Sequence, residues 1–369
     1  MRVLVTGGAG FIGSHTADAL LAGGHEVRIL DNLLPPVHQG QKPGYLKHEI
    51  DFIKGDVRDK TAMAKALEGV DAVYHLAAYQ GFLPDYSNFF HTNAAGTAML
   101  FEVIAERKIS LHKVIVASSQ AVYGEGKYFC PAHGQVYPAA RPVERLLEGD
   151  WEVKCPLCGH KCEEQLTDEQ VVNPETQYAM SKYTQEMIAL NLGKRHGIPA
   201  VCLRYSITQG PRQSFYNAYS GILRIFAVRM LNGQSPVAYE DGLMKRDYVH
   251  IKDVVAANLL VLEKQEADYQ VYNVGSGKPI TVLEYANKLK ERIGTDIDPV
   301  LPGEFRLGDV RHIISDVSRL KNLGWTVEYG LDDIIRDYLE WVKSFGPVAD
   351  HFAQAEVDLK SSGAIRSGR

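Results

Sequence analysis

The sequence predicts an α/β protein built on a doubly wound parallel sheet, with a smaller α/β lobe and a cysteine-rich insertion. Three observations indicate this fold. Short apolar runs alternate with helical segments over the first 205 residues, and a glycine-rich turn joins the first run to the first helix. The alternation is interrupted once, over residues 125–172. The length of 369 residues is sufficient for two domains, because one domain takes about 150 residues.

The predicted strands and helices alternate in the order that such a sheet requires. The runs expected as strands cover residues 2–5, 26–30, 50–54, 72–76, 113–117 and 200–205. The first expected helix ends near residue 22, and the others cover residues 60–68, 88–107 and 175–196. Alternation of this kind favours parallel pairing through helical crossovers, so we expect six or seven strands in one sheet.

After residue 205 the pattern is less regular. Short helices are expected at residues 221–232, 252–264, 281–292 and 330–344. They indicate a smaller lobe over the carboxyl ends of the strands, where such sheets bind ligands. The expected division is residues 1–205 plus about 243–275 for the sheet domain, about 206–242 plus 276–345 for the lobe, and a polar, mobile tail at 346–369.

Composition and charge exclude some classes of function. Lysine and arginine number 40 against 45 acidic residues, a net charge of −5, which argues against a dedicated nucleic-acid binder. No apolar run approaches the roughly 18 residues that span a bilayer, and the first apolar run is too short for a signal peptide. We therefore expect a cytoplasmic protein without a membrane partner.

A G-x-x-G-x-x-G turn formed by Gly7, Gly10 and Gly13 lies between the first strand and the first helix. A Cβ at the first two positions would block the approach of a pyrophosphate, and the helix start offers free N–H groups. Asp31 ends the second strand, where a carboxylate accepts hydrogen bonds from ribose hydroxyls and repels a 2′-phosphate. The pattern predicts a Rossmann-type domain that binds NAD rather than NADP.

Asp56 and Val57 follow the third strand and are candidate adenine contacts, although an aspartate there is also common in plain turns.

Tyr178 and Lys182 are four residues apart in a predicted helix, so they share one face. A neighbouring ammonium lowers the pKa of a phenol and makes it a better base. Such pairs also occur by chance, but Ser119 at the end of a predicted strand adds a hydroxyl for proton transfer.

Together these motifs resemble the extended short-chain dehydrogenase/reductases, specifically the NAD-dependent nucleotide-sugar epimerase/dehydratase family. The resemblance covers residues 1–345 in family order. The matching segments are Thr-Gly-Gly-Ala-Gly-Phe-Ile-Gly (6–13), Gly-Asp-Val-Arg-Asp (55–59), His-Leu-Ala-Ala (75–78), Ser-Ser-Gln-Ala-Val-Tyr-Gly (118–124), Tyr-Ala-Met-Ser-Lys (178–182), Leu-Arg-Tyr (203–205), Arg-Asp-Tyr-Val-His-Ile-Lys-Asp-Val (246–254) and Arg-Leu-Gly-Asp (306–309).

The resemblance implies a role for each matching residue. Tyr178 is the expected catalytic base, with Lys182 and Ser119 assisting. Arg246 and Arg306 are expected to hold the substrate diphosphate, unless they form surface ion pairs. The residues expected at a tightly bound NAD are Gly7, Gly10, Phe11, Ile12, Gly13, Asp31, Asn32, Asp56, Val57, Leu76, Ala77, Ala78, Asn93, Tyr178 and Lys182. The residues expected at the substrate are Gln80, Ser119, Gln120, Arg204, Arg212, Arg246 and Arg306.

The resemblance also narrows the reaction. Dehydratases of the family carry an acidic residue just after the active-site hydroxyl, where this chain has Gln120 and Ala121. The reaction that the resemblance then implies is inversion at C4 of a dTDP-, UDP- or GDP-sugar through a 4-keto intermediate. The dTDP-L-rhamnose 4-epimerase-like and UDP-glucose 4-epimerase-like members are the most similar in this respect. Ser206 and Ile207 replace the usual Phe-Asn, which leaves the sugar open. The alternatives are an NADH-dependent 4-keto-sugar reductase, a 4,6-dehydratase and an NAD-sensing scaffold.

Four of the five cysteines lie close together in the insertion. Cys130 and His133 form one short knuckle and Cys155 and Cys158 another, and each can supply two ligands to one structural zinc ion. Cys162 and His160 compete for one ligand position, and free cysteines are the alternative. The family resemblance further implies a homodimer formed by the helices near 92–107 and 176–195.

Overall fold

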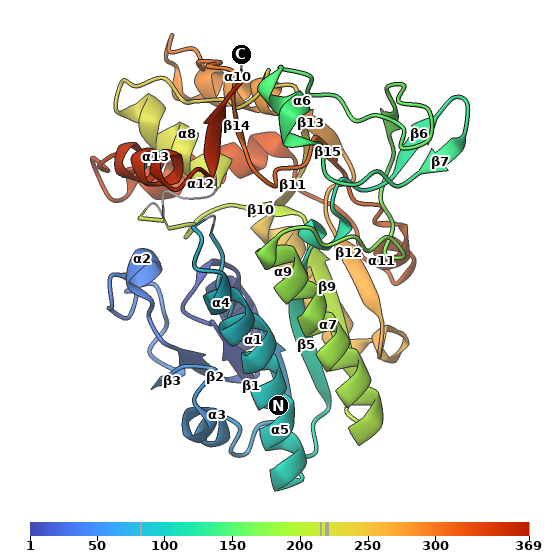
Figure 1. Ribbon diagram of the computed structural model, residues 1–369. Coiled ribbons are helices and arrows are strands. Elements are labelled where there is room, and N and C mark those ends of the chain that lie inside the picture. Colours follow the sequence, from blue (N-terminus) through green and yellow to red (C-terminus); the bar gives the residue numbers. More distant parts are fainter. Residues whose placement is uncertain (82, 215, 218–220, 369) are drawn as a thin grey trace.

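A computed structural model describes residues 1–81, 83–214, 216–217 and 221–368 (Figure 1). The lower half in Figure 1 contains a large sheet with helices on both faces. The upper half contains smaller sheets and the helices of the second half of the chain. The predicted fold class, an α/β protein with a Rossmann-type parallel sheet, is confirmed.

The large sheet has seven parallel strands in the order β12-β9-β5-β4-β1-β2-β3. Six of them lie where the sequence predicts strands, and the seventh, β12, follows the predicted helix at 252–264. The strands are β1 (Arg2–Thr6), β2 (Glu26–Asp31), β3 (Asp51–Lys54), β4 (Ala72–His75), β5 (Lys113–Ser119), β9 (Ala200–Tyr205) and β12 (Val271–Val274).

Two groups of helices cover the two faces of this sheet. Val3 and Val5 of β1 pack on one face with α1 and α9, whereas Leu4 packs on the other with α3, α5 and α7. This alternation follows from the two-residue repeat of a strand. The helices are α1 (Phe11–Ala22), α3 (Lys60–Ala66), α5 (Gly96–Arg107), α7 (Gln177–His196) and α9 (Ile251–Glu263). The short helices α2 (Pro35–His38), α4 (Tyr86–Phe89) and α11 (Ser318–Asn322) and a π-helical turn (Phe90–Ala95) complete this half.

A second sheet lies beyond the carboxyl ends of the first. It consists of β10 (Ile207–Gln209), β11 (Lys245–His250), β13 (Pro279–Thr281) and β15 (His312–Ile313). Three helices, α8 (Ile222–Leu231), α10 (Val282–Ile293) and α12 (Leu331–Lys343), pack together in a separate core. α10 begins with a capping box, in which Thr281 and Glu284 each accept a hydrogen bond from the other's backbone N–H.

The insertion forms a small three-stranded sheet, β7-β6-β8, at the right of Figure 1. Its elements are β6 (Tyr128–Cys130), β7 (Gly134–Val136), α6 (Val143–Leu147) and β8 (Glu163–Glu164). Its core is small and contains the side chains of Cys130, Cys155 and Cys162.

The segment after residue 345 is not the mobile tail that its polar composition predicts. It forms α13 (Phe352–Ser361) and β16 (Ile365–Ser367), and β16 pairs antiparallel with β14 (Glu304–Arg306). Phe352, Ala355 and Leu359 lie on one face of α13 and are buried. This apolar face anchors the segment against α8 and the strand pair.

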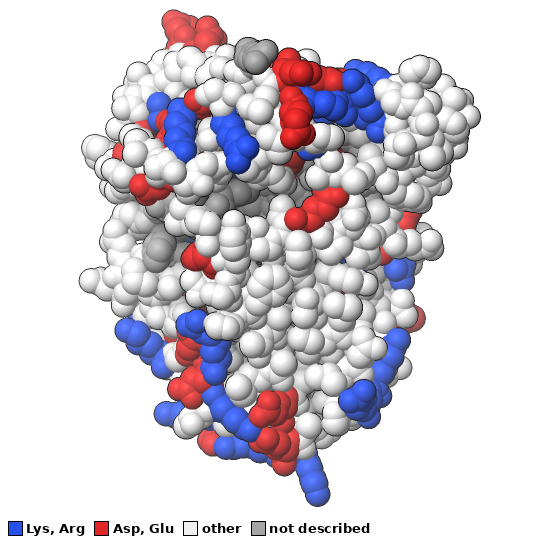
Figure 2. Space-filling model, in the orientation of Figure 1, with Lys and Arg blue, Asp and Glu red and all other residues white. Residues whose placement is uncertain are grey.

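The face of the protein shown in Figure 2 carries charges of both signs. Acidic and basic side chains lie interspersed on the face shown in Figure 2. Among the described residues, no helix is both long and apolar enough to cross a membrane.

Candidate active site

A cavity of about 1070 Å³ lies between the carboxyl ends of the large sheet and the second half of the chain. Its walls come from the β1–α1 turn, from the loops after β2, β4 and β5, from the start of α7, and from the segments around β11 and β14. Pockets for single drug-sized ligands measure about 300–1,000 Å³, so this cavity has room for more than one such molecule.

Gly7, Gly10 and Gly13 of the β1–α1 turn must be glycines for different structural reasons. A Cβ on Gly7, whose φ is +67°, would lie 2.8 Å from the backbone of Ala77, in the loop after β4. A Cβ on Gly13 would lie 2.3 Å from the carbonyl oxygen of Gly7. Gly10 is the least crowded of the three, although a Cβ there would still lie 3.2 Å from the carbonyl oxygen of Gly7. All three glycines line the cavity, so the expected approach of a pyrophosphate to the first two stays a prediction, and Gly7 must also be a glycine because of its contact with Ala77.

Asp31 ends β2 beside this turn. Its carboxylate accepts hydrogen bonds from the backbone N–H groups of Ala9 (3.0 Å) and Leu33 (2.8 Å). These bonds fix its orientation at the cavity edge, where it is 7% exposed. Of the other residues expected at the cofactor, those that also line the cavity are Phe11, Ile12, Asn32, Val57, Leu76, Ala77, Ala78, Tyr178 and Lys182.

Asp56 and Asn93 are the two expected cofactor residues that do not line the cavity. Asp56 accepts two hydrogen bonds from the Arg58 guanidinium, which holds its pKa at about 2. Asn93 is fully buried and accepts a hydrogen bond from the backbone N–H of Tyr79 (2.7 Å), while its amide donates to the Ser181 hydroxyl (2.9 Å). Both residues therefore position neighbours of the cavity, and the expected direct contacts are not supported.

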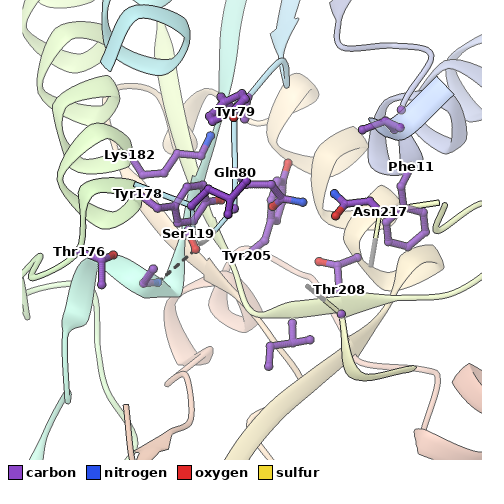
Figure 3. Close-up of a pocket in the computed structure, with 18 of the residues that line it drawn as sticks. Phe11, Tyr79, Gln80, Ser119, Thr176, Tyr178, Lys182, Tyr205, Thr208 and Asn217 are labelled. Carbon is purple, nitrogen blue, oxygen red and sulfur yellow. Dashed lines mark hydrogen bonds between the residues drawn. The ribbon is translucent and has the colours of Figure 1, made fainter. Parts of the chain in front are cut away.

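Tyr178 and Lys182 lie one turn apart on α7 and both line the cavity, as the spacing predicts. The helix begins at Thr176, whose hydroxyl accepts a hydrogen bond from the backbone N–H of Ala179 (3.2 Å). Ser119 reaches the same place from the end of β5 (Figure 3). Three side chains that are distant in sequence thus meet at the cavity wall.

The electrostatics of this group differ from the expectation. Burial raises the pKa of Tyr178 to about 12, and a hydrogen bond with Ser119 opposes this only in part. Burial also lowers the pKa of Lys182 to about 7, against the attraction of Glu186. The Lys182 ammonium donates hydrogen bonds to the carbonyl oxygen of Ala117 and to Gln185, both at 2.8 Å. Protein groups alone therefore do not lower the pKa of the phenol.

The arginines expected at the substrate divide into two groups. Arg246 and Arg306 line the cavity, as do Gln80 and Gln120. Arg204 does not line the cavity, so the structure gives no support to its predicted contact with the substrate. Its guanidinium is 2% exposed, and its ion pair with Glu186 on α7 fixes it inside the protein.

Arg212 lines a different part of the cavity from the one expected. It forms an ion pair with Asp18 on α1 (2.7 Å) and lies 4.9 Å from the centre of the Tyr45 ring. The Tyr45 hydroxyl in turn donates to the carbonyl oxygen of Ala9 in the glycine turn (2.7 Å). Arg212 therefore lies beside the expected cofactor region rather than the expected sugar region.

Sequence reasoning missed several cavity residues. Tyr45 and Arg224 line the cavity but were not assigned to the site from the sequence. Arg224 lies in α8, where burial lowers its pKa to about 10. The turn at 362–364 between α13 and β16 also lines the cavity. The spacing of Phe352, Ala355 and Leu359, three and four residues apart, is the signal by which that last helix is recognisable.

Cys130, His133, Cys155 and Cys158 form a second site, in the insertion. One ligand atom from each lies within 4.8 Å of all the others. Cys162 is not one of these four residues. Its thiol donates to the carbonyl oxygen of His160 (3.8 Å) and also approaches Cys130 and Cys155. The structure thus brings together the four residues that the two knuckles predict.

A glycine turn, an acidic strand end and a tyrosine–lysine pair around one cavity define a dinucleotide-binding enzyme of the short-chain dehydrogenase type. Comparison with protein families agrees. The model of the NAD dependent epimerase/dehydratase family matches residues 3–144 and 156–275, and the chain belongs to this family. The unmatched residues between these two stretches lie in the insertion.

Individual relatives match over nearly the whole chain. The dTDP-L-rhamnose 4-epimerase of Burkholderia thailandensis is 31% identical, over 92% of this chain and 94% of its own. The solved UDP-glucose 4-epimerase of Thermotoga maritima with UDP-glucose has a TM-score of 0.77 and 30% identity, covering 94% of this chain and 99% of its own. That of Thermus thermophilus in complex with NAD has a TM-score of 0.75 and 29% identity, covering 94% and 100%.

Proposed function

We propose that this protein is an NAD-dependent epimerase that inverts C4 of a nucleoside diphosphate sugar through a 4-keto intermediate. The observation that carries the proposal is the meeting of Ser119, Tyr178 and Lys182 at one cavity with the glycine turn and two arginines. The names of the relatives, which are 4-epimerases of dTDP-L-rhamnose and UDP-glucose, support it.

The cavity fits NAD at the β1–α1 turn. Gly10 presents bare backbone to the cavity beside the first turn of α1, which suits a pyrophosphate, and the fixed carboxylate of Asp31 suits the hydroxyls of an unphosphorylated ribose. When bound there, NAD would supply the hydride acceptor and donor for C4 of the sugar and, in its oxidised form, a positive charge.

In this mechanism Tyr178 moves one proton. Its phenolate oxygen takes the proton of the C4 hydroxyl as the C4 hydride leaves, and returns it to the C4 oxygen when the hydride comes back. Ser119 donates a hydrogen bond to the same oxygen and holds the sugar in place. Lys182, fixed by Ala117 and Gln185, holds its amino group beside the site, and its pKa of about 7 leaves it partly charged near neutral pH. Because burial raises the pKa of Tyr178 to about 12, the positive charge of an oxidised cofactor would favour the phenolate.

Arg246 and Arg306 are the residues proposed for the diphosphate of the substrate. Both line the cavity, and a guanidinium suits two phosphate groups. Elimination of water is disfavoured because Gln120, beside Ser119, offers no acid or base. The base of the nucleotide, whether thymine, uracil or guanine, is left to experiment.

Proton NMR in D₂O with UDP-, dTDP- and GDP-sugars tests the proposal. We expect a C4 epimer to form without added NAD and without deuterium on carbon. Deuterium at C3 or C5, or loss of water, would contradict the mechanism. Turnover only with 4-keto sugars and NADH would identify a reductase instead.

We further propose that the Cys/His group of the insertion binds one structural zinc ion. Tetrahedral zinc, with Zn–S bonds of about 2.3 Å and Zn–N bonds of about 2.0 Å, places two sulfurs about 3.8 Å apart and a sulfur and a nitrogen about 3.6 Å apart. The thiols of Cys130 and Cys158 are 3.7 Å apart, and His133 Nδ1 lies 3.7 Å from Cys130 and 3.5 Å from Cys155. The residues therefore fit this metal, with no ligand position left for chemistry.

Metal analysis of purified protein tests this site. We expect one zinc per chain, lost in a Cys158→Ser variant and retained in a matched Cys162→Ser variant. Loss of zinc in the Cys162→Ser variant alone would show that the ligand set is a different one.

A homodimer is also proposed, through the helices expected near residues 92–107 and 176–195, which are the π-helical turn, α5 and α7, together with the adjoining α4. These elements pack side by side and expose large apolar side chains. Met180 and Met187 on α7 are each 42% exposed, and Tyr86 is 58% exposed. Light scattering should show a dimer that a Met187→Glu variant weakens, and a monomeric wild-type protein would contradict the proposal.

A further inference from the structure

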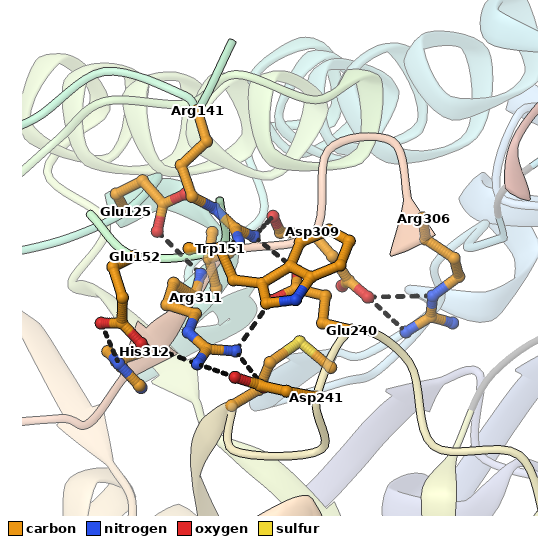
Figure 4. Close-up of polar contacts among 12 residues, drawn as sticks. Glu125, Arg141, Trp151, Glu152, Glu240, Asp241, Arg306, Asp309, Arg311 and His312 are labelled. Carbon is orange, nitrogen blue, oxygen red and sulfur yellow. Dashed lines mark hydrogen bonds and ion pairs between the residues drawn. The ribbon is translucent and has the colours of Figure 1, made fainter. Parts of the chain in front are cut away.

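We propose that the cysteine-rich insertion positions Arg246 and Arg306 through a buried network of arginine and carboxylate side chains, and so controls the affinity for the substrate diphosphate (Figure 4). The inference rests on the proposed function of the cavity. Arg141 and Arg311 are the positioning residues of this network.

Arg141 connects the insertion to two other segments. Its guanidinium, 2% exposed, forms ion pairs with Glu125 and with Glu240, both at 2.9 Å. It also donates hydrogen bonds to the carbonyl oxygens of Trp151 (2.9 Å) and Asp309 (2.8 Å). One side chain of the insertion thus holds the backbone three residues after Arg306.

Arg311 continues the network and is fully buried. Its guanidinium forms ion pairs with Glu240 (2.9 Å), Asp241 (2.7 Å) and, from the insertion, Glu152 (2.8 Å). Its backbone N–H donates to Glu125 (2.8 Å), the carboxylate that Arg141 also contacts. The segment 309–311 is therefore tied to the insertion at two points on its backbone and at one side chain.

This segment in turn fixes both cavity arginines. Arg246 donates hydrogen bonds to the carbonyl oxygens of Arg311 (3.0 Å) and Val310 (2.8 Å). Arg306 forms an ion pair with Asp309 (2.8 Å). Neutral carbonyl groups orient the Arg246 guanidinium without cancelling its charge, so this charge stays available to an anion in the cavity.

The burial of so many charges favours a positioning role over a purely stabilising one. Taking ions out of water carries a penalty that pairing does no more than offset, so apolar packing would hold the insertion equally well. Apolar packing has no direction, whereas Arg141 reaches two carboxylates and two carbonyl oxygens at fixed angles. The network therefore specifies where the backbone of the segment 309–311 lies.

Binding of nucleoside diphosphates to the full-length protein, with its retained cofactor, tests the inference. Calorimetry with UDP, dTDP and GDP first identifies which of them the wild-type protein binds. An Arg141→Met variant and a milder Arg141→Lys variant are then compared with a Lys127→Met control. The control breaks an ion pair within the insertion, between Lys127 and Asp168, and neither of these side chains has a described hydrogen bond or ion pair with residues 309–311. The lysine variant keeps a charge for the buried carboxylates, but it cannot reach all four partners.

We expect the dissociation constant for the nucleotide to rise between about 10-fold and 100-fold in Arg141→Met and less in Arg141→Lys, because an ångström of misplacement is enough for such an effect. The content of bound NAD should stay unchanged, and KM for the sugar nucleotide should rise more than kcat falls. The Lys127→Met variant should match the wild type.

Other results overturn the inference. Unchanged nucleotide affinity in a folded Arg141 variant would do so, and so would a parallel loss of NAD and nucleotide binding, which indicates general destabilisation. If the methionine variant does not fold, the lysine variant decides. A wild-type protein that binds no nucleoside diphosphate would instead remove the proposed function, and this inference with it.

Discussion

The ion pair between Arg204 and Glu186 allows an experiment to decide whether Arg204 stabilises the fold or binds the substrate. The guanidinium donates two hydrogen bonds of 2.8 Å to the carboxylate and two more, of 3.0 and 3.2 Å, to the carbonyl oxygens of Glu169 and Val171. Each charged side chain is only 2% exposed. An Arg204→Met variant leaves a buried carboxylate without its cation.

Breaking such a buried pair costs about 3–5 kcal/mol of unfolding free energy. We expect a loss of this size for Arg204→Met, measured by urea unfolding. Most of it should return in the double variant Arg204→Met/Glu186→Gln, which removes the uncompensated charge. Nucleotide affinity, measured where the variant is folded, should stay within about twofold of wild type, because Arg204 does not line the cavity.

The reasoning would be refuted by the opposite pattern. A stable Arg204→Met variant with strongly weakened nucleotide binding would place Arg204 at the substrate, as the sequence motif suggested. Equal destabilisation in the single and double variants would show that the carbonyl contacts, rather than the ion pair, hold this region.

Three further predictions follow from described contacts. Tyr178→Phe removes the proton acceptor and should lower turnover by about 10²–10⁴-fold with NAD content unchanged; full activity in the NMR assay would contradict its role. Gly13→Ala places a Cβ 2.3 Å from the Gly7 carbonyl oxygen and should lower stability and retained NAD, whereas Gly44→Ala, with nothing within 4 Å, should change neither. Burial lowers the pKa of His75 from 6.5 to about 3. Between these values the unfolded chain binds the proton that the folded protein does not, so unfolding free energy should fall as the pH drops below 6.5, and fall less in His75→Gln, as urea midpoints at several pH values will show.

The large sheet was predictable because its signals are local. Apolar runs such as residues 113–117 mark strands, and the rule that parallel strands need crossovers then limits their order. The meeting of Ser119 with Tyr178 and Lys182 was predictable for the same reason, since each lies at a strand end or a helix start. The four ligands of the insertion followed from their pairwise spacing. Their chemical roles stay predictions, as does the cytoplasmic location.

What failed depends on partners that are distant in sequence. The sequence around Arg204 does not indicate that its guanidinium forms a buried ion pair with Glu186. Asn93 has the residue type of a ligand contact, but the described hydrogen bonds of its side chain all go to the backbone of Tyr79 and to Ser181. The polar composition after residue 345 concealed the three apolar positions of α13, because short helices give weak signals.

The place of β16 has a consequence for how the protein is made. The large sheet is complete once β12, ending at Val274, has left the ribosome, whereas β16 pairs with β14 only after Ser367 has been added. At about 5–20 residues per second, the intervening stretch takes about 5–20 s to synthesise. During translation, the half of the cavity that holds the glycine turn can therefore form before the part that β16 completes.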